Sequence, residues 1–382
     1  MMEVKLRMIY NEGKYNKHWE TKKLSELGTF SRGVSKHRPR NDKKLFEGGG
    51  YPLVQTGEIK AANLYIQKHT QEYGEFGLSQ SKIWDKGILC ITIAANIAET
   101  AILSYPMCFP DSVVGFKAND KESSEMFMYY IFSYIKQSIQ NAASGSIQDN
   151  INIEYLTSLE FKIPSKHHQD EITNLLGCID KKILINNKIN DNLSAMAYNT
   201  YMHYFFGKKP NGKLVDILIE NEKSKIQVGE AKDSEGGYPF FTSGEAILKW
   251  KDNFVDGRNC FLNTGGNADV KFYVGKAAYS TDTWCISANQ NLEDYMYLLL
   301  LSIKPELNKK FFQGTGLKHL QKPLLKERPI YIPKTEEITA FNAQIQHWFD
   351  NIAENTRENQ HLTALRDWLL PLLMNGQATI TD

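Results

Sequence analysis

Two carboxylates and a lysine are of the kind that nucleases use to hold a metal ion over a phosphodiester. Asp111 follows Pro110, and Asp269 precedes Lys271 by two positions, so each pair is one piece of a Pro-Asp…Asp-x-Lys motif. The pieces lie in different halves of the chain, and the position that matches Lys271 in the first half is Thr100. Neither half holds a complete motif, so the sequence predicts no catalytic residue and no metal site.

Other catalytic signatures are missing from the sequence. It contains no Gly-x4-Gly-Lys-Ser/Thr loop, no Asn-Pro-Pro-aromatic or Asp-Pro-Pro-aromatic tetrapeptide and no Gly-x-Ser-x-Gly nucleophile elbow. The adjoining His167-His168 lack ligand spacing to an acid or a cysteine, and we interpret them as a loop. The sequence therefore favours a protein that binds and does not catalyse.

Polar and basic side chains gather in loops at matching places of two halves. Reading DNA requires cations for phosphates, and amide, hydroxyl or guanidinium groups for base edges. The DNA-binding candidates are Arg32, Lys36, Arg38, Arg40, Gln55, Thr56, Asn96, Ser146 and Gln148 in the first half, and Thr242, Ser243, Asn267, Thr315, Lys318 and Lys322 in the second. Each alone could be an ordinary turn or cap residue. The repetition of the set favours double-stranded DNA as a partner.

These loops belong to a duplicated chain. Residues 51–58 (YPLVQTGE) return as residues 238–245 (YPFFTSGE), and Ile163-Pro164 returns 169 positions later as Ile332-Pro333. We predict an α+β fold, with two similar mixed α/β domains separated by two long antiparallel helices that form a coiled-coil spacer. The predicted boundaries are 1–166 and 208–335 for the domains, 167–207 and 336–376 for the helices, and 377–382 for a tail.

Each half is expected to repeat one order of elements. We predict short opening helices at 19–28 and 212–220, buried helices at 125–141 and 295–302, and closing strands at 159–163 and 329–333. The remaining predicted strands are 51–55, 88–93, 101–104 and 112–116, then 238–242, 260–263, 270–274 and 284–287.

The long helices carry apolar residues at the spacing of helix-on-helix packing. The predicted pairing positions are Leu176, Ile179, Ile183, Asn186, Asn190 and Leu193 in the first helix, and Ile345, Trp348, Ile352, Asn355, Asn359 and Leu362 in the second. Asparagine is unfavourable within an apolar seam, and its best-attested use there is to fix register and partner number. The apolar residues 369–373 are expected to be exposed at the end of the second helix.

The distribution of charge and the cysteine content indicate the kinds of partner and the cellular location to expect. The net charge is +1, but residues 32–44 carry six Lys or Arg against one Asp, whereas the last helix is acidic. This contrast indicates two different partner surfaces. The five cysteines form no Cys-x-x-Cys, the first ten residues do not resemble a signal peptide, and no apolar run approaches the length of a membrane span. We expect a cytoplasmic protein with free thiols.

At this point the chain resembles the specificity (S) subunits of type I restriction–modification enzymes. The similarity lies in the opening Trp19…Gly28 segment and in Ile163-Pro164 followed by Asp170-Glu171-Ile172 and a long helix. The second half repeats it at Ile332-Pro333 and Glu337-Ile338. The individual motifs are short, but their order and duplication extend over nearly the whole chain.

The resemblance implies two target-recognition domains, each reading one half of a bipartite DNA site. It implies that the helices dock two methyltransferase (M) subunits and that restriction (R) subunits join through the complex. The S subunit itself is not catalytic and binds no cofactor, because S-adenosylmethionine, ATP and Mg²⁺ belong to its partners. Two alternatives stay open: a stand-alone nuclease or DNA-modifying enzyme with an unrecognised active site, and the specificity module of another restriction system.

Overall fold

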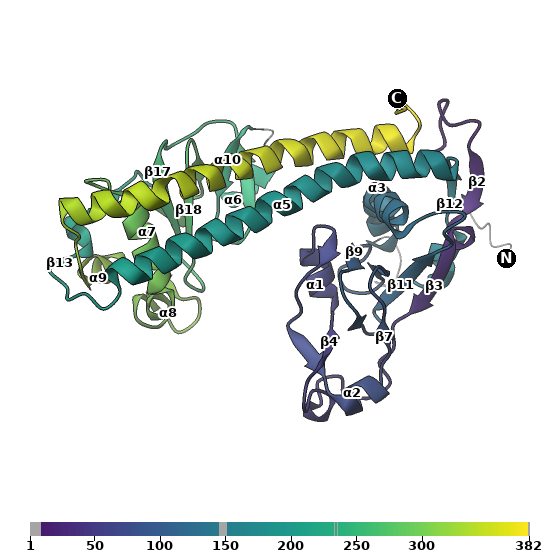
Figure 1. The fold of residues 1–382 in the computed structure, drawn as a ribbon, viewed down its shortest axis with the longest axis horizontal. Coiled ribbons are helices and arrows are strands. Elements are labelled where there is room, and N and C mark those ends of the chain that lie inside the picture. The colour runs from purple at the N-terminus through teal and green to yellow at the C-terminus, as the bar shows by residue number, and fades with distance from the viewer. Residues whose placement is uncertain (1–8, 145–150, 233, 235, 381–382) are drawn as a thin grey trace. The chain divides into compact units, whose positions relative to one another are not determined.

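A computed structural model describes residues 9–144, 151–232, 234 and 236–380. The chain divides into two compact units: unit 1 comprises Met1–Ile183 and His361–Asp382, and unit 2 comprises Leu184–Gln360. Two long helices, α5 (Lys166–Phe205) and α10 (Thr335–Met374), contribute residues to both units (Figure 1). None of the helices in the described ranges combines the length and apolar character that crossing a membrane requires.

Unit 1 is built around a five-stranded sheet in the order β3-β11-β8-β9-β5, flanked by the smaller sheets β6-β4-β10-β7 and β1-β12-β2. The strands are β1 (Ile9–Tyr10), β2 (Glu20–Lys23), β3 (Gly28–Arg32), β4 (Tyr51–Leu53), β5 (Tyr65–Ile66), β6 (Gln71–Tyr73), β7 (Ile83–Trp84), β8 (Leu89–Thr92), β9 (Thr100–Leu103), β10 (Met107–Cys108), β11 (Val113–Ala118) and β12 (Glu160–Ile163). The helices are α1 (Thr56–Ala61), α2 (Glu75–Ser79), α3 (Glu125–Ser144) and α4 (Ile153–Ser158).

The central sheet of unit 1 is buried on both faces because its strands alternate between two apolar clusters. Leu89 and Ile91 of β8 pack with Phe127 of α3, whereas Cys90 faces the cluster that contains Trp84 and Phe109. Successive side chains of a strand point to opposite faces, so an uninterrupted apolar strand covers two cores at once. The sheet is therefore enclosed between two cores, and accessible residues are found in the loops that join its strands, such as 94–97.

Unit 2 repeats this topology with fewer strands. Its sheets are β14-β20-β17-β18, β16-β15-β19, β13-β23 and β21-β22. The strands are β13 (Gly212–Lys213), β14 (Leu218–Glu220), β15 (Tyr238–Phe241), β16 (Ile247–Trp250), β17 (Arg258–Asn263), β18 (Val270–Val274), β19 (Ala278–Tyr279), β20 (Thr283–Ala288), β21 (Phe312–Gln313), β22 (His319–Leu320) and β23 (Pro329–Ile330). The helices are α6 (Val228–Lys232), α7 (Glu293–Ser302), α8 (Lys304–Glu306) and α9 (Lys322–Lys326). The order β14-β20-β17-β18 matches β3-β11-β8-β9, and β15 pairs with β19 in parallel as β4 pairs with β10.

The long helices pair antiparallel, as the sequence predicts. In unit 2, Asn186 donates to Asn359 at 2.9 Å and Asn355 donates to Asn190 at 2.8 Å. The residue numbers of the partners thus increase along α5 while they decrease along α10, which means that the helices run antiparallel. Unit 1 has the same polarity, because Arg366 of α10 donates to Asp180 of α5 at 2.8 Å. By the sequence repeat, Asn186 matches Asn355 and Asn190 matches Asn359. The hydrogen bonds join the other combinations, Asn186 with Asn359 and Asn190 with Asn355.

The predicted helix-pairing positions differ in exposure. Leu176, Ile179, Ile183, Asn186 and Ile345 are buried. Asn190, Leu193, Trp348, Ile352, Asn355, Asn359 and Leu362 are partly buried. The apolar end of α10 differs from expectation, because Leu370 and Leu373 pack into the core of unit 1. Trp368 is the exposed residue there, with 63% of its surface accessible.

The two predicted opening helices are wrong. Residues 20–23 form β2, which pairs antiparallel with β12, and only Leu24–Glu26 make a 3₁₀ turn. In unit 2, β13 pairs with β23 and is followed by a 3₁₀ turn at Leu214–Asp216. The apolar residues Leu24 and Leu27 suffice for one tight turn. The residues before and after this turn pair as strands β2 and β3 and do not extend it into a helix.

The predicted loop at His167-His168 is also wrong, since both residues lie in the first turns of α5. Ser165 precedes them, and its hydroxyl accepts a hydrogen bond from the backbone N–H of His168 at 3.4 Å. Serine is a favoured N-cap residue, and this bond starts the helix. His167 also lies 3.5 Å from Glu171, one helical turn away.

Candidate nucleic-acid interface

One edge of the unit 1 sheet collects most of its DNA-binding candidates. Arg32 ends β3 and pairs in register with Val114 of β11, which places it beside the loop before β11. Gln55 and Thr56 follow β4, and Asn96 lies in the loop between β8 and β9. Antiparallel pairing brings the end of β8 and the starts of β9 and β11 to the same edge. Arg32 and the loop that carries Asn96 therefore lie at the same end of the five-stranded sheet, whereas Gln55 and Thr56 follow a strand of the β6-β4-β10-β7 sheet.

The basic residues of this edge converge on Asp111. Its backbone carbonyl accepts from Arg32 Nε at 2.6 Å, and its carboxylate binds Arg40 at 2.6 Å and Arg38 at 3.2 Å. The Arg38 and Arg40 side chains remain about half exposed, at 53% and 51%. Surface ion pairs of this kind are weak, so these guanidinium groups can turn to a DNA phosphate at little cost. Lys36 is exposed on the same segment.

A buried hydroxyl shapes the loop that carries Asn96. Thr92, the last residue of β8, is fully buried, and its hydroxyl bonds the backbone carbonyl of Asn96 and accepts from the N–H of Glu99 at 2.9 Å. Ala95 and Ala98 both have φ of 61°, a left-handed conformation that alanine rarely adopts. Such strain of about 1–3 kcal/mol per residue persists only where the surroundings impose it. The loop is therefore held in one shape.

Unit 2 gathers its candidates at the corresponding edge. The N–H of Gly266 donates to Lys318 O, and the N–H of Leu320 donates to Thr264 O, both at 2.9 Å. These bonds bring the loop after β17, with exposed Asn267, against the segment that contains Thr315 and Lys318. The candidates from distant parts of unit 2 thus lie together.

The loop after β15 is organised by Lys271 of β18. The Lys271 ammonium donates to the backbone carbonyls of Thr242, at 2.9 Å, and Gly244, and burial lowers its pKa. The Thr242 side chain is 6% exposed, and its hydroxyl bonds the backbone of Gly244 and Ala246. Thr242 therefore builds the loop, and partly exposed Ser243 is the side chain left at its surface.

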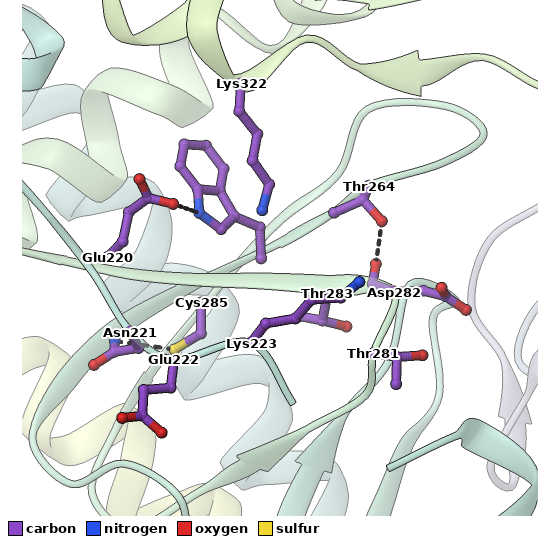
Figure 2. A pocket seen from close by; sticks show the side chains of 11 residues that line it. Glu220, Asn221, Glu222, Lys223, Thr264, Thr281, Asp282, Thr283, Cys285 and Lys322 are labelled. Carbon is purple, nitrogen blue, oxygen red and sulfur yellow. Dashed lines mark hydrogen bonds between the residues drawn. The ribbon is translucent and has the colours of Figure 1, made fainter. Parts of the chain in front are cut away.

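A pocket of about 360 Å³ lies beside Lys322 at this edge. Figure 2 shows Lys322 and Thr264 among its lining side chains, with the Thr264 hydroxyl donating to Asp282 O at 2.9 Å. The Lys322 ammonium stands 4.9 Å from the centre of the Trp284 ring, and burial lowers its pKa. The Trp284 indole donates to Glu220 at 2.8 Å. The pocket is thus lined by two lysines, three acidic residues and three threonines: Lys223 and Lys322, then Glu220, Glu222 and Asp282, then Thr264, Thr281 and Thr283.

The family model described as "Type I restriction modification DNA specificity domain" matches residues 16–195 and 208–364. The chain belongs to this family. The two matched segments fall on the two halves of the sequence repeat, as a duplicated specificity domain requires.

One relative of known name covers nearly the whole chain, and another covers less than half of it. It is 20% identical over 417 residues to the Type I restriction enzyme MjaIX specificity subunit of Methanocaldococcus jannaschii, covering 97% of this chain and 96% of that protein. It is 24% identical over 181 residues to the Type I restriction enzyme EcoDI specificity subunit of Escherichia coli, covering 45% and 40%. The crystal structure of the type I S subunit from M. genitalium has the same fold, with a TM-score of 0.61 at 14% identity over 96% of this chain and 99% of that one.

Within this type I specificity fold, the nuclease-like residues have structural partners. Asp111 lies in unit 1 and binds arginines, whereas Asp269 lies in unit 2 and binds Lys304 at 2.7 Å. Lys271 holds carbonyl oxygens. No group of three or more His, Cys, Asp or Glu residues in the described ranges could hold a metal ion.

Sequence reasoning did not identify Thr92 and Asn263, which shape the candidate DNA-binding loops, and it considered Lys271 only as a piece of a nuclease motif. One signal could have found the first two: they lie 171 positions apart, the same spacing as Asn96 and Asn267. Of the predicted DNA-binding residues, Ser146 and Gln148 lie outside the described residues.

Proposed function

We propose that this chain is the DNA-specificity subunit of a type I restriction–modification complex, and that each unit reads one half of a bipartite site in double-stranded DNA. The observation that carries the proposal is the duplicated polar edge, where loops 93–99 and 264–269 leave equivalent strands. Arg32, Arg38 and Lys318 supply cations for phosphates beside these loops.

The long helices are proposed to dock two methyltransferase subunits, through which restriction subunits join. Exposed acidic residues such as Glu336 and Glu354 on α10 support a partner other than DNA. The chain would itself be non-catalytic, and S-adenosylmethionine, ATP and Mg²⁺ would bind to its partners. A cytoplasmic location is supported by five free cysteines, four of them buried.

The decisive experiment is co-expression of the chain with the methyltransferase subunits of its host, followed by sequencing of methylated bases. We expect one bipartite motif with a fixed gap. Exchanging residues 29–160 for those of another family member should change only one half-site. A change in both half-sites would contradict independent reading by the two units.

A second experiment tests the absence of catalysis. The purified chain is incubated with duplex DNA, S-adenosylmethionine and Mg²⁺, without other subunits. We expect neither methylation nor cleavage, and turnover by the chain alone would identify a stand-alone enzyme. The same mixture with methyltransferase subunits added is the positive control.

A further inference from the structure

The loops after β8 and β17 are fixed at equivalent points by different side chains. Thr92 ends β8 and Asn263 ends β17, and they are 0% and 5% exposed. The Thr92 hydroxyl bonds the backbone carbonyl of Asn96, four residues on. The Asn263 amide donates to the carbonyl of Asn267, also four residues on. Both units therefore hold the same loop carbonyl with a buried polar group.

Each buried group also holds the return of its loop to the next strand. Thr92 accepts from the N–H of Glu99 at 2.9 Å, and Asn263 Oδ1 accepts from the N–H of Asp269 at 2.7 Å. A buried polar group without its partner is costly. The loops can therefore leave these shapes only by breaking two buried bonds at once.

The two loops hold the carbonyl four residues on in the same way but differ in length and in backbone conformation. The turn of unit 1 contains the left-handed Ala95 and Ala98, whereas unit 2 has left-handed Gly266. Thr92 of unit 1 corresponds to Asn263 of unit 2, and Ala95 corresponds to Gly266. An asparagine nevertheless stands at the equivalent position of each loop, as Asn96 and Asn267. What the two units share is thus an asparagine whose backbone carbonyl is held by the buried residue that ends the preceding strand.

We propose that Asn96 and Asn267 each read an adenine in the major groove, and that Thr92 and Asn263 are the positioning residues that aim them. This rests on the proposed function. A carboxamide pairs with adenine N6 and N7 through two hydrogen bonds, a geometry that needs a fixed backbone. Asn267 is exposed. Asn96 is partly exposed, and its Oδ1 accepts from Lys60 at 3.2 Å, a cation that can move to a phosphate.

The surroundings of Asn267 fit this role. Lys318 and Thr315 lie on the segment bonded to its loop, where they can contact the DNA backbone. Backbone contacts set orientation and carry no sequence information. Removing one should weaken binding to all sequences alike, whereas removing the reading amide should change preference at one base pair.

The test is selection from randomised duplex DNA by the full chain assembled with its methyltransferase subunits, followed by sequencing of the bound pool. Asn267→Ala should lower the preference for adenine on the order of 10- to 100-fold at one position of one half-site. Asn96→Ala should do the same in the other half-site. Thr315→Ala is the matched control, with weaker binding and an unchanged motif.

The positioning role is tested with a conservative pair. Thr92→Val removes the hydroxyl and should blur the same base pair as Asn96→Ala, whereas Thr92→Ser keeps the hydroxyl and should restore the wild-type motif. If Thr92→Val does not fold, Asn263→Asp tests the positioning role in unit 2, because it keeps the acceptor for the Asp269 N–H and removes the amide donor to the Asn267 carbonyl, so it should weaken the preference at the base pair that Asn267→Ala affects. A wild-type complex without a bipartite motif would reject the proposed function. A bipartite motif that both asparagine variants leave unchanged would reject this inference alone.

Discussion

Unit 1 fastens its helices to its globular part through a buried ion pair, whereas unit 2 has aromatic rings at the equivalent position and places its own ion pair elsewhere, where Arg258 binds the buried Asp294 and also Asp350 of α10. Asp180 of α5 has a 5% exposed side chain and accepts from Tyr130 at 2.7 Å and from Arg366 at 2.8 Å. The residue 169 positions later is Phe349, whose ring lies 5.0 Å from Phe272 and 5.6 Å from Tyr297. The repeat has kept the place of the contact and changed its chemistry.

The partners changed together with the central residue. Arg366 corresponds to Ala197 in the repeat, and Ala197 is fully buried in the same apolar cluster as Phe349. Burial lowers the pKa of Arg366, but the hydrogen bond and charge of Asp180 outweigh it and raise the pKa above its usual value. An ionic contact depends on all of its members, whereas an aromatic cluster tolerates partial loss. The two junctions should therefore fail differently.

The largest effect is expected for Asp180→Ala. It leaves Arg366 and the Tyr130 hydroxyl without their buried partner, which should lower the free energy of unfolding by about 3–5 kcal/mol. Urea unfolding of the full chain measures it. The triple variant Tyr130→Phe, Asp180→Leu, Arg366→Met imitates the apolar junction of unit 2 and should stay within about 1 kcal/mol of wild type. A triple variant as unstable as the single one would refute this view of the junction.

A smaller effect is expected for Phe349→Leu. The substitution keeps an apolar side chain and leaves a limited cavity between Phe272 and Tyr297, so the free energy of unfolding should fall by about 1–2 kcal/mol. The same urea titration gives the value. A loss as large as that of Asp180→Ala would mean that the aromatic junction is no more tolerant than the ionic one.

The repeated elements could be predicted because local pattern and packing agree in them. The 3.5-residue spacing around Asn186 and Asn355 gives the antiparallel helices, and apolar runs such as 88–93 give β8 of a sheet buried on both faces. The helix predicted at 19–28 was wrong because the apolar periodicity of this segment covers only one short turn. The pairing of β2 with β12 joins residues that are far apart in the sequence, and a local pattern does not reveal it. Nothing in the sequence distinguishes Thr92 and Asn263 from other polar residues. Their role becomes visible only in the structure, where they are buried and bond the carbonyls of Asn96 and Asn267.

The starts of the two long helices continue the contrast between the units. In unit 1, the buried Gln169 donates to the carbonyls of Glu122 and Pro164 and accepts from Ser123. In unit 2, the carboxylate of Glu337 in the first turn of α10 accepts from Lys208, Tyr331 and the N–H of Lys334. The first contact is uncharged and the second is ionised, so acid should loosen only the second.

Glu337→Gln tests that difference. Hydrogen bonds from Lys208, Tyr331 and the Lys334 backbone lower the pKa of Glu337 from 4.5 to about 2. The folded chain thus binds fewer protons than the unfolded chain between these values, and the stabilisation is complete above about pH 4.5 and is lost as the pH falls toward 2. Because the site is close to solvent, the loss at neutral pH should be only about 0.5–1 kcal/mol. Thermal unfolding from pH 7 to pH 3 should show wild type approaching the variant, whereas Glu336→Gln, its exposed neighbour, should follow wild type throughout. A constant gap between wild type and Glu337→Gln would mean that the helix start in unit 2 depends on shape and not on charge.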